Sequence, residues 1–71
     1  MDSGTELAIR AIIRGLFQSD AINRHQVQAI MSALKEAAGG AQEGRDAETA
    51  KELAALCKHI HLDTGVPPSS D

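Results

Sequence analysis

Apolar residues recur at helical spacing in three separate segments of this chain. In the first segment the large apolar side chains stand three and four positions apart, at Ile9, Ile12, Ile13, Leu16 and Phe17. The same spacing returns in two later sets, Val27, Ile30, Met31 and Leu34, then Leu53, Leu56, Cys57 and Ile60. Polar residues recur at every fourth position on the opposite side of the first segment, at Glu6, Arg10, Arg14 and Gln18. This period is that of amphipathic helices, and no segment alternates with the two-residue period of a strand. We therefore expect an all-α fold of three short helices.

The first helix is predicted over residues 4–18. Ser3 and Glu6 have the Ser-x-x-Glu spacing of a capping box just ahead of the apolar stripe. Gly15 lies inside the segment, where a glycine costs roughly 1 kcal/mol relative to alanine. Because apolar residues continue beyond it, Gly15 is interpreted as a point where a neighbouring backbone approaches closely.

The second helix is predicted over residues 24–38. Asn23 is a favourable N-cap residue, and Gln26 stands three positions later in the reciprocal position of a capping box. Gly39 and Gly40 follow the last apolar positions of the segment. Glycine readily adopts the left-handed conformation that ends helices, so the pair predicts the end of this helix.

The third helix is predicted over residues 46–62, after a glycine-rich segment at 39–44 that has the composition of a flexible linker. Asp46 is a suitable N-cap, and Gly65 is a candidate terminator. Residues 66–71 combine prolines with small polar residues, which predicts a disordered tail.

These elements predict a single helical domain over residues 1–65. The apolar positions favour an antiparallel hairpin of the first two helices, with the third helix packed across it. The predicted core comprises the large apolar side chains of all three segments: Leu7, Ile9, Ile12, Ile13, Leu16, Phe17, Ile22, Val27, Ile30, Met31, Leu34, Leu53, Leu56, Cys57 and Ile60. A chain of 71 residues buries only roughly 60% of its unfolded surface and is marginally stable alone. We therefore expect homo-oligomerisation, most simply as a two-fold dimer.

Cysteine usage and hydropathy indicate a cytoplasmic protein. Cys57 is the single cysteine of the sequence, so no disulfide can form within the chain, and one thiol fits a reducing compartment. Arg10 and Arg14 interrupt the longest apolar stretch, which falls short of the about 20 residues that a membrane span needs. Asp2 and Glu6 stand where a secretory signal peptide has basic residues. We expect neither a membrane segment nor a signal peptide.

The distribution of charge argues against nucleic acid as a partner. The net charge is −3; residues 1–38 carry four basic and four acidic residues, whereas residues 39–71 carry three and six. A protein that binds duplex DNA neutralises phosphates with an excess of cations. The alternative interpretation is a small dimeric helix-turn-helix regulator, in which the start of the second helix would present four residues to the major groove: Arg24, His25, Gln26 and Gln28.

A Cys-x-His-x-His run raises the question of metal binding and catalysis. On a helix Cys57 and His61 share a face, and two such pairs across a dimer axis would make a tetrahedral zinc site; His59 points elsewhere. The simpler interpretation is a small buried thiol and a histidine near a helix C-terminus. Cys57, His61 and Asp63 are of the residue types that serve as nucleophile, base and orienting group in catalysis. All three lie within seven residues at the end of one helix, which offers no cleft for a substrate. We expect no enzyme, no cofactor and no metal.

The sequence favours a protein that acts by helix-face docking, through protein–protein interaction or regulation. In this hypothesis the docking stripe of the first helix comprises Ile9, Ile13, Leu16 and Phe17. Arg10 and Arg14 stand four positions apart at its rim and set orientation, because apolar contact gives affinity while charge fixes register. The charge distribution also permits these two arginines to meet the acidic half of another subunit, and the simpler alternative is that they are solvated. The expected partners are a second copy of the chain and other proteins.

Overall fold

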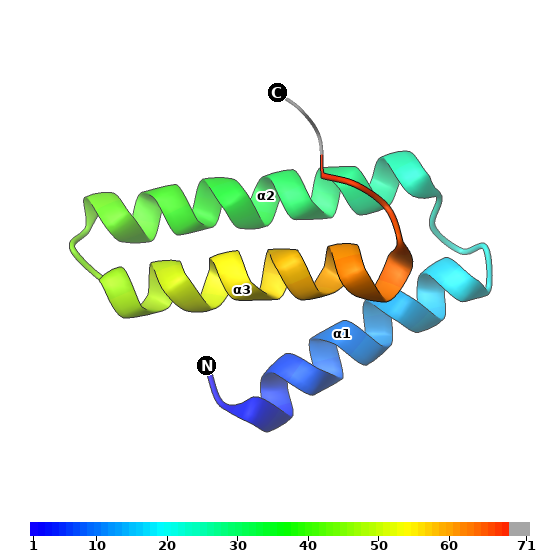
Figure 1. Cartoon of the computed structure of the whole chain (residues 1–71), viewed down its shortest axis with the longest axis horizontal. Coiled ribbons are helices and arrows are strands. Elements are labelled where there is room, and N and C mark those ends of the chain that lie inside the picture. Colours follow the sequence, from blue (N-terminus) through cyan, green and yellow to red (C-terminus); the bar gives the residue numbers. More distant parts are fainter. Residues whose placement is uncertain (69–71) are drawn as a thin grey trace.

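Three α-helices make up the fold of this protein (Figure 1). The computed structural model describes residues 1–68, which form α1 (Ser3–Gln18), α2 (Arg24–Glu43) and α3 (Ala47–Thr64). Over these residues there is no β-strand, so the all-α prediction is confirmed. In the same part of the chain, no helix is long and apolar enough to cross a membrane.

The start of α1 differs from the predicted capping box. Asp2, rather than Ser3, is the N-cap, and its side chain accepts a hydrogen bond from the backbone N–H of Thr5 at 2.7 Å. Aspartate caps helices as well as serine does, and its charge is favourable at the positive end of the helix dipole. The side chain of Glu6 is therefore free to bond elsewhere, and it reaches His59 on α3.

The caps of α2 and α3 match the sequence-based expectation. The N–H of Gln26 donates to Asn23 Oδ1 at 2.9 Å, and the N–H of Asn23 donates to Gln26 Oε1 at 2.7 Å, which completes the predicted capping box. Asp46 caps α3 by accepting from the N–H and the hydroxyl of Thr49, at 3.1 and 2.7 Å. Gly65 ends α3 with a left-handed φ of 72°, as predicted.

The predicted end of the second helix at Ala38 is wrong. Gly39 and Gly40 are helical, and α2 continues to Glu43 before the chain turns at Arg45, which takes a left-handed φ of 63°. Each glycine costs about 0.8–1.0 kcal/mol relative to alanine in a helix. The helix persists because its last turns lie along the start of α3, so tertiary packing overrides the local preference. The predicted linker is thereby reduced to a short turn.

The helices are paired differently from the predicted hairpin. α2 and α3 run antiparallel, side by side, and α1 crosses diagonally against α3, with few contacts to α2 (Figure 1). A hairpin of the first two helices is therefore not confirmed. The Cα atoms extend over 37 × 30 × 16 Å, so the molecule is thin in one direction. In this arrangement much of α1 remains on the surface.

The core lies where the three helices and the segment after α3 meet. Its fully buried large side chains come from α2 and α3: Val27, Met31, Leu56 and Ile60. Ile13, Ala50 and Val66 are also buried, and a second set packs partly exposed against this core: Ile9, Phe17, Ile22, Ile30, Leu34 and Cys57. Three residues of the predicted core are instead exposed, namely Leu7 (58%), Ile12 (61%) and Leu16 (41%). α1 buries one side against the rest of the molecule, and these three residues lie off that side.

Residues 66–68 do not behave as the predicted disordered tail. Val66 is only 3% exposed and belongs to the core cluster. The left-handed Gly65 turns the chain back toward α2, where the side chain of Gln28 donates to the carbonyl oxygen of Pro67 at 3.1 Å. Nδ1 of His61 lies 2.7 Å from the carbonyl oxygen of Val66. The remainder of the predicted tail, residues 69–71, lies outside the described residues.

Candidate functional site

The structure divides the predicted docking stripe of α1 between two sides of the helix. Ile13 is buried at 9% exposure, and Ile9 and Phe17 pack against the core, so these three residues face the rest of the chain. Leu16 is 41% exposed and Arg14 is exposed. Residues four apart on a helix lie on one side, which explains why the row at positions 9, 13 and 17 is buried together. The four residues of the docking stripe therefore do not form one exposed surface in the folded chain.

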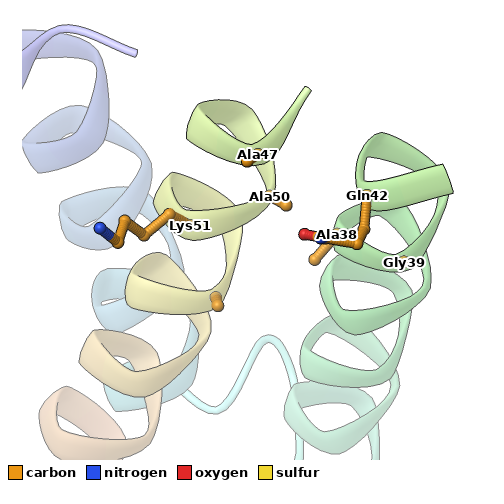
Figure 2. Close-up of a pocket in the computed structure, with 7 residues that line it drawn as sticks. Ala38, Gly39, Gln42, Ala47, Ala50 and Lys51 are labelled. Atoms are coloured by element: carbon orange, nitrogen blue, oxygen red, sulfur yellow. The ribbon is translucent and has the colours of Figure 1, made fainter. Parts of the chain in front are cut away.

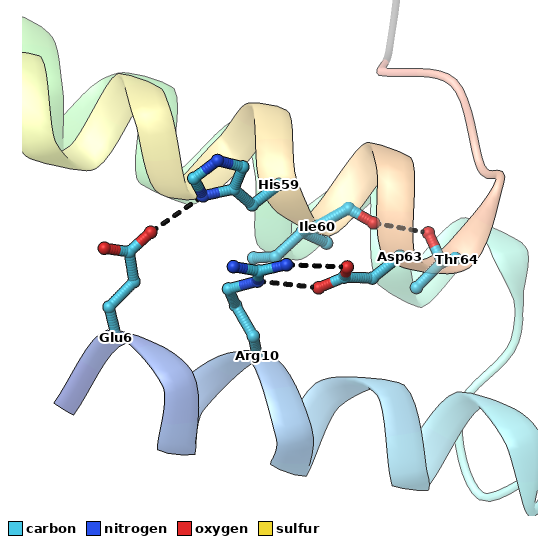
Figure 3. Close-up of polar contacts among 6 residues, drawn as sticks. All are labelled: Glu6, Arg10, His59, Ile60, Asp63 and Thr64. Carbon is cyan, nitrogen blue, oxygen red and sulfur yellow. Dashed lines mark hydrogen bonds and ion pairs between the residues drawn. The ribbon is translucent and has the colours of Figure 1, made fainter. Parts of the chain in front are cut away.

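The sequence suggested that Arg10 is a free residue at the rim of the docking stripe, but in the structure its side chain is paired. Its Nε donates to Asp63 Oδ2 at 2.9 Å and its Nη2 donates to Asp63 Oδ1 at 3.0 Å (Figure 3). The two side chains are 26% and 14% exposed. A bidentate guanidinium–carboxylate pair is among the stronger charge-assisted hydrogen-bond arrangements. Arg10 thus meets the acidic half of its own chain, and it holds α1 against the end of α3.

Two further polar contacts join the same helices. Glu6 Oε1 lies 2.7 Å from Nδ1 of His59 (Figure 3). The N-terminal ammonium of Met1, just ahead of α1, pairs with Glu52 on α3. The contacts of Glu6 and Arg10 lie on the side of α1 that faces α3. Glu6 and Arg10, which the periodicity assigned to the solvent side, are therefore turned toward α3, and the outer side of α1 loses two of its charges.

The side of α1 that faces away from α3 is consequently uncharged and partly apolar. We define the outward face of α1 as Ala8, Ala11, Ile12, Gly15 and Leu16, all of which are exposed. They stand three, four, seven and eight positions after the first, which places them on one side of the helix. Arg14, at the edge of this face, is the one exposed charged residue within α1, every residue of which is described. Surface helices ordinarily present their charged residues to water. On α1 two of the three charged residues, Glu6 and Arg10, instead face α3.

Gly15 has open space around it, contrary to the expected close approach of a neighbouring backbone. A Cβ atom added at Gly15 would meet no atom of the described chain within 4 Å. Gly15 therefore leaves open space on the outward face of α1. Sequence periodicity placed Ile12 in the core because its spacing also fits the buried row at positions 9, 13 and 17. The small residues at 8, 11 and 15 were the signal in the sequence that could have identified the exposed side.

The polar link between α1 and α3 predicts that the fold weakens in acid. The hydrogen bonds and charge of Arg10 lower the pKa of Asp63, and the bonds from Thr49 likewise lower the pKa of Asp46. A carboxyl whose pKa is lower in the folded chain stabilises it above the unfolded pKa of about 3.9, and this stability is lost as the pH falls through the folded pKa. The urea midpoint is therefore expected to be constant above about pH 5 and to fall below about pH 4.

Two variants test the origin of this acid sensitivity. Asp63→Asn removes the titrating carboxyl, and Arg10→Ala removes the cation that lowers its pKa. Both variants should show a smaller fall of the urea midpoint between pH 5 and pH 2.5 than the parent chain. A fall of unchanged size in both would contradict the assignment to this pair.

Cys57 and His61 do not face a common ligand. Cys57 Sγ donates to the carbonyl oxygen of Met31 at 3.6 Å, whereas His61 bonds at the segment after α3. Asp63, the third residue of the arrangement considered for catalysis, is bound by Arg10. Among the described residues, no three side chains of metal-binding type gather in one place. Each of these side chains has a structural contact of its own.

The start of α2 presents fewer free groups than the helix-turn-helix alternative requires. The side chain of Gln26 is bonded in the capping box and that of Gln28 donates to Pro67. Arg24 and His25 are exposed. Two of the four residues that would contact bases thus have partners within the chain.

An open groove of about 490 Å³ lies between the end of α2 and the start of α3 (Figure 2). Its lining consists mainly of alanine and glycine, with Gln42 and Lys51 as the polar members: Ala38, Gly39, Gln42, Ala47, Ala50, Lys51 and Ala54. The groove arises because small side chains fill little of the space between the helices. Its lining supplies one ionisable group, and no pair of groups for acid–base chemistry.

The candidate site is therefore the outward face of α1, where Ile12 and Leu16 project from an uncharged helical surface. Its chemistry is that of apolar contact, because its five residues carry neither a titratable group nor a side-chain hydrogen-bond donor. Comparison with known protein families, curated proteins and solved structures finds no match to this chain.

Proposed function

We propose that this chain is a non-enzymatic protein that acts by protein–protein interaction, through docking of the outward face of α1. The observation that supports the proposal is the exposure of Ile12 (61%) and Leu16 (41%) on a helical side without charge. Apolar patches on a protein surface commonly mark sites of association. A regulatory role follows naturally for a small protein that presents one helix to its partners.

The mechanism is the packing of one helix face against an apolar surface. Ile12 and Leu16 would lose their contact with water, and the small residues beside them allow the partner to approach closely. Arg14 at the edge would set the orientation, while Arg10 has a structural role in holding α1. The simplest partner is a second copy of the chain, since a small chain gains buried apolar surface by forming a two-fold oligomer.

Ile12→Asp is expected to abolish self-association. The substitution places a carboxylate at the centre of the outward face, where burial of an unpaired charge is strongly unfavourable. Light scattering after gel filtration, over a dilution series, should give a mass near twice the 7.5 kDa chain mass for the parent and 7.5 kDa for the variant. Ala33→Asp is the matched control, because Ala33 is exposed on α2, away from this face.

Circular dichroism of both variants separates loss of docking from loss of fold. Ile12 is exposed, so both proteins should keep the helical spectrum of the parent. The proposed self-docking would be refuted by a parent chain that remains at 7.5 kDa at every concentration. An Ile12→Asp variant that associates as strongly as Ala33→Asp would show that another surface is used.

A further inference from the structure

We infer that the outward face of α1 binds the same face of a second copy, as an antiparallel pair of helices that crosses between positions 11 and 12. In this pair Ile12 of each copy occupies a socket on the other, formed by Ala8, Ala11, Ile12 and Gly15. The inference rests on the proposed function and specifies its partner and geometry.

The charge of the face favours a second copy as its occupant. In a two-fold interface each patch meets itself, so a charged patch would meet its own sign. The five residues of the outward face carry no charge, and the structure engages the charges of Glu6 and Arg10 with α3. A partner with strong charge would find no complementary group on this face. Pairing of this face with itself therefore brings no like charges of its five residues together.

The shape of the face is also self-complementary. Ile12 projects with 61% exposure, and positions 8, 11, 12 and 15 have the spacing of the four residues that receive a knob in helix pairs. Three of these four residues are alanine or glycine. A Cβ at Gly15 would meet nothing within 4 Å beyond its chain neighbours and the backbone of its own helix, so this position is open in the single chain. One large side chain and a shallow socket on the same face suit a symmetric exchange.

The positions of the remaining charges select the antiparallel direction. A parallel pair would place Arg14 directly beside Arg14 of the second copy. An antiparallel pair centred between positions 11 and 12 separates the two along the axis by about 7.5 Å, from a rise of about 1.5 Å per residue. The turn between α2 and α3, together with the helix ends beside it, carries Glu43, Asp46 and Glu48 against the single cation of Arg45. It lies in the half of the molecule where α1 begins, so antiparallel pairing keeps the two acidic turns at opposite ends (Figure 1).

Disulfide formation between single-cysteine variants tests this direction. In a Cys57→Ser chain, one protein carries Ala8→Cys and another carries Gly15→Cys; the two are mixed and treated with a mild oxidant. Antiparallel pairing brings position 8 of one copy beside position 15 of the other, so the main product should be the 8–15 heterodimer, identified by mass spectrometry. Parallel pairing would give the 8–8 and 15–15 homodimers instead.

A second pair of variants tests the socket. Gly15→Leu fills it and should reduce the mass in solution to that of one chain, 7.5 kDa. Gly40→Leu is the matched control, because Gly40 is also helical, exposed and without a described atom within 4 Å of an added Cβ. It should associate as the parent does. Circular dichroism should show both variants to be helical.

The outcomes separate this inference from the proposed function. The antiparallel geometry would be overturned by 8–8 and 15–15 disulfides, or by a chain that dimerises without cross-linking at these positions. In either case Ile12→Asp would still decide whether docking uses α1 or another surface. Equal association of Gly15→Leu and Gly40→Leu would overturn the socket. A parent chain that is monomeric at all concentrations would overturn both the inference and self-docking.

Discussion

Replacing Leu56 by alanine is expected to lower the free energy of unfolding by about 2–5 kcal/mol. Leu56 is 1% exposed and lies in the core cluster with Val27, Met31 and Ile60. Truncation removes its apolar transfer energy and leaves a cavity between α2 and α3. Native domains are stable by only about 5–15 kcal/mol, and a chain of this size lies at or below the low end. The variant should therefore be partly unfolded at room temperature.

Leu62→Ala is the matched control for this experiment. Leu62 is on the same helix and is 63% exposed, so its truncation should change the free energy of unfolding by less than about 0.5 kcal/mol. Urea denaturation followed by circular dichroism provides the measurement. All samples must have one protein concentration, because association makes the apparent stability depend on concentration. Similar losses for the two variants would contradict the location of the core.

The features that the sequence predicted well are those made by residues close together in the chain. The capping box of Asn23 and Gln26 and the cap of Asp46 each involve residues three positions apart. The left-handed turn at Gly65 depends on one residue type. The apolar period also predicted that Val27, Met31, Leu56 and Ile60 would be buried. Local geometry decides these features, so their signals are complete within a few residues.

The pairing of helices depends on contacts that the local pattern does not contain. Arg10 and Asp63 are 53 positions apart, as are Glu6 and His59. Periodicity assigned Glu6 and Arg10 to the solvent side, since charged residues are usually exposed. In the structure each has a partner on α3, and this places Glu6 and Arg10 on the inner side of α1, whereas Arg14 is exposed.

The helical conformation of Gly39 and Gly40 likewise could not be predicted from the local sequence. Glycine propensity alone favours an end at this point, and the residues of α3 that lie along α2 are distant in the sequence. Tertiary packing can outweigh a propensity difference of about 1 kcal/mol per residue.

The candidate site was partly predictable for the same reasons. The sequence predicted docking through α1 and named Leu16 for it, and docking itself stays a prediction. It also placed both Leu16 and Ile12 in the core, whereas the structure exposes both. α1 carries large apolar residues on more than one side, so a single helical period cannot decide which of them faces inward. That choice depends on the inner contacts of Arg10 and Glu6. Once these are known, the small residues at Ala8 and Gly15 identify the outer side.

Val66→Asp is expected to lower the free energy of unfolding by about 2–4 kcal/mol, because residues 65–68 are part of the fold rather than a free tail. Val66 is 3% exposed in the core cluster. A buried unpaired carboxylate is unfavourable enough that the segment should detach from α2. The loss then includes the burial of Val66 and the hydrogen bonds of Gln28 and His61 to this segment.

Pro68→Asp adds the same charge two residues later, at an exposed position. It should change the free energy of unfolding by less than about 0.5 kcal/mol. Urea denaturation at pH 7 compares the two variants, and hydrogen exchange of the side-chain amide of Gln28 reports on the segment directly. Faster exchange in Val66→Asp, with parent-like exchange in Pro68→Asp, would show that the valine anchors the chain end. Equal stability of the two variants would mean that the segment leaves the core at no cost, so the core of the free protein would consist of the three helices alone.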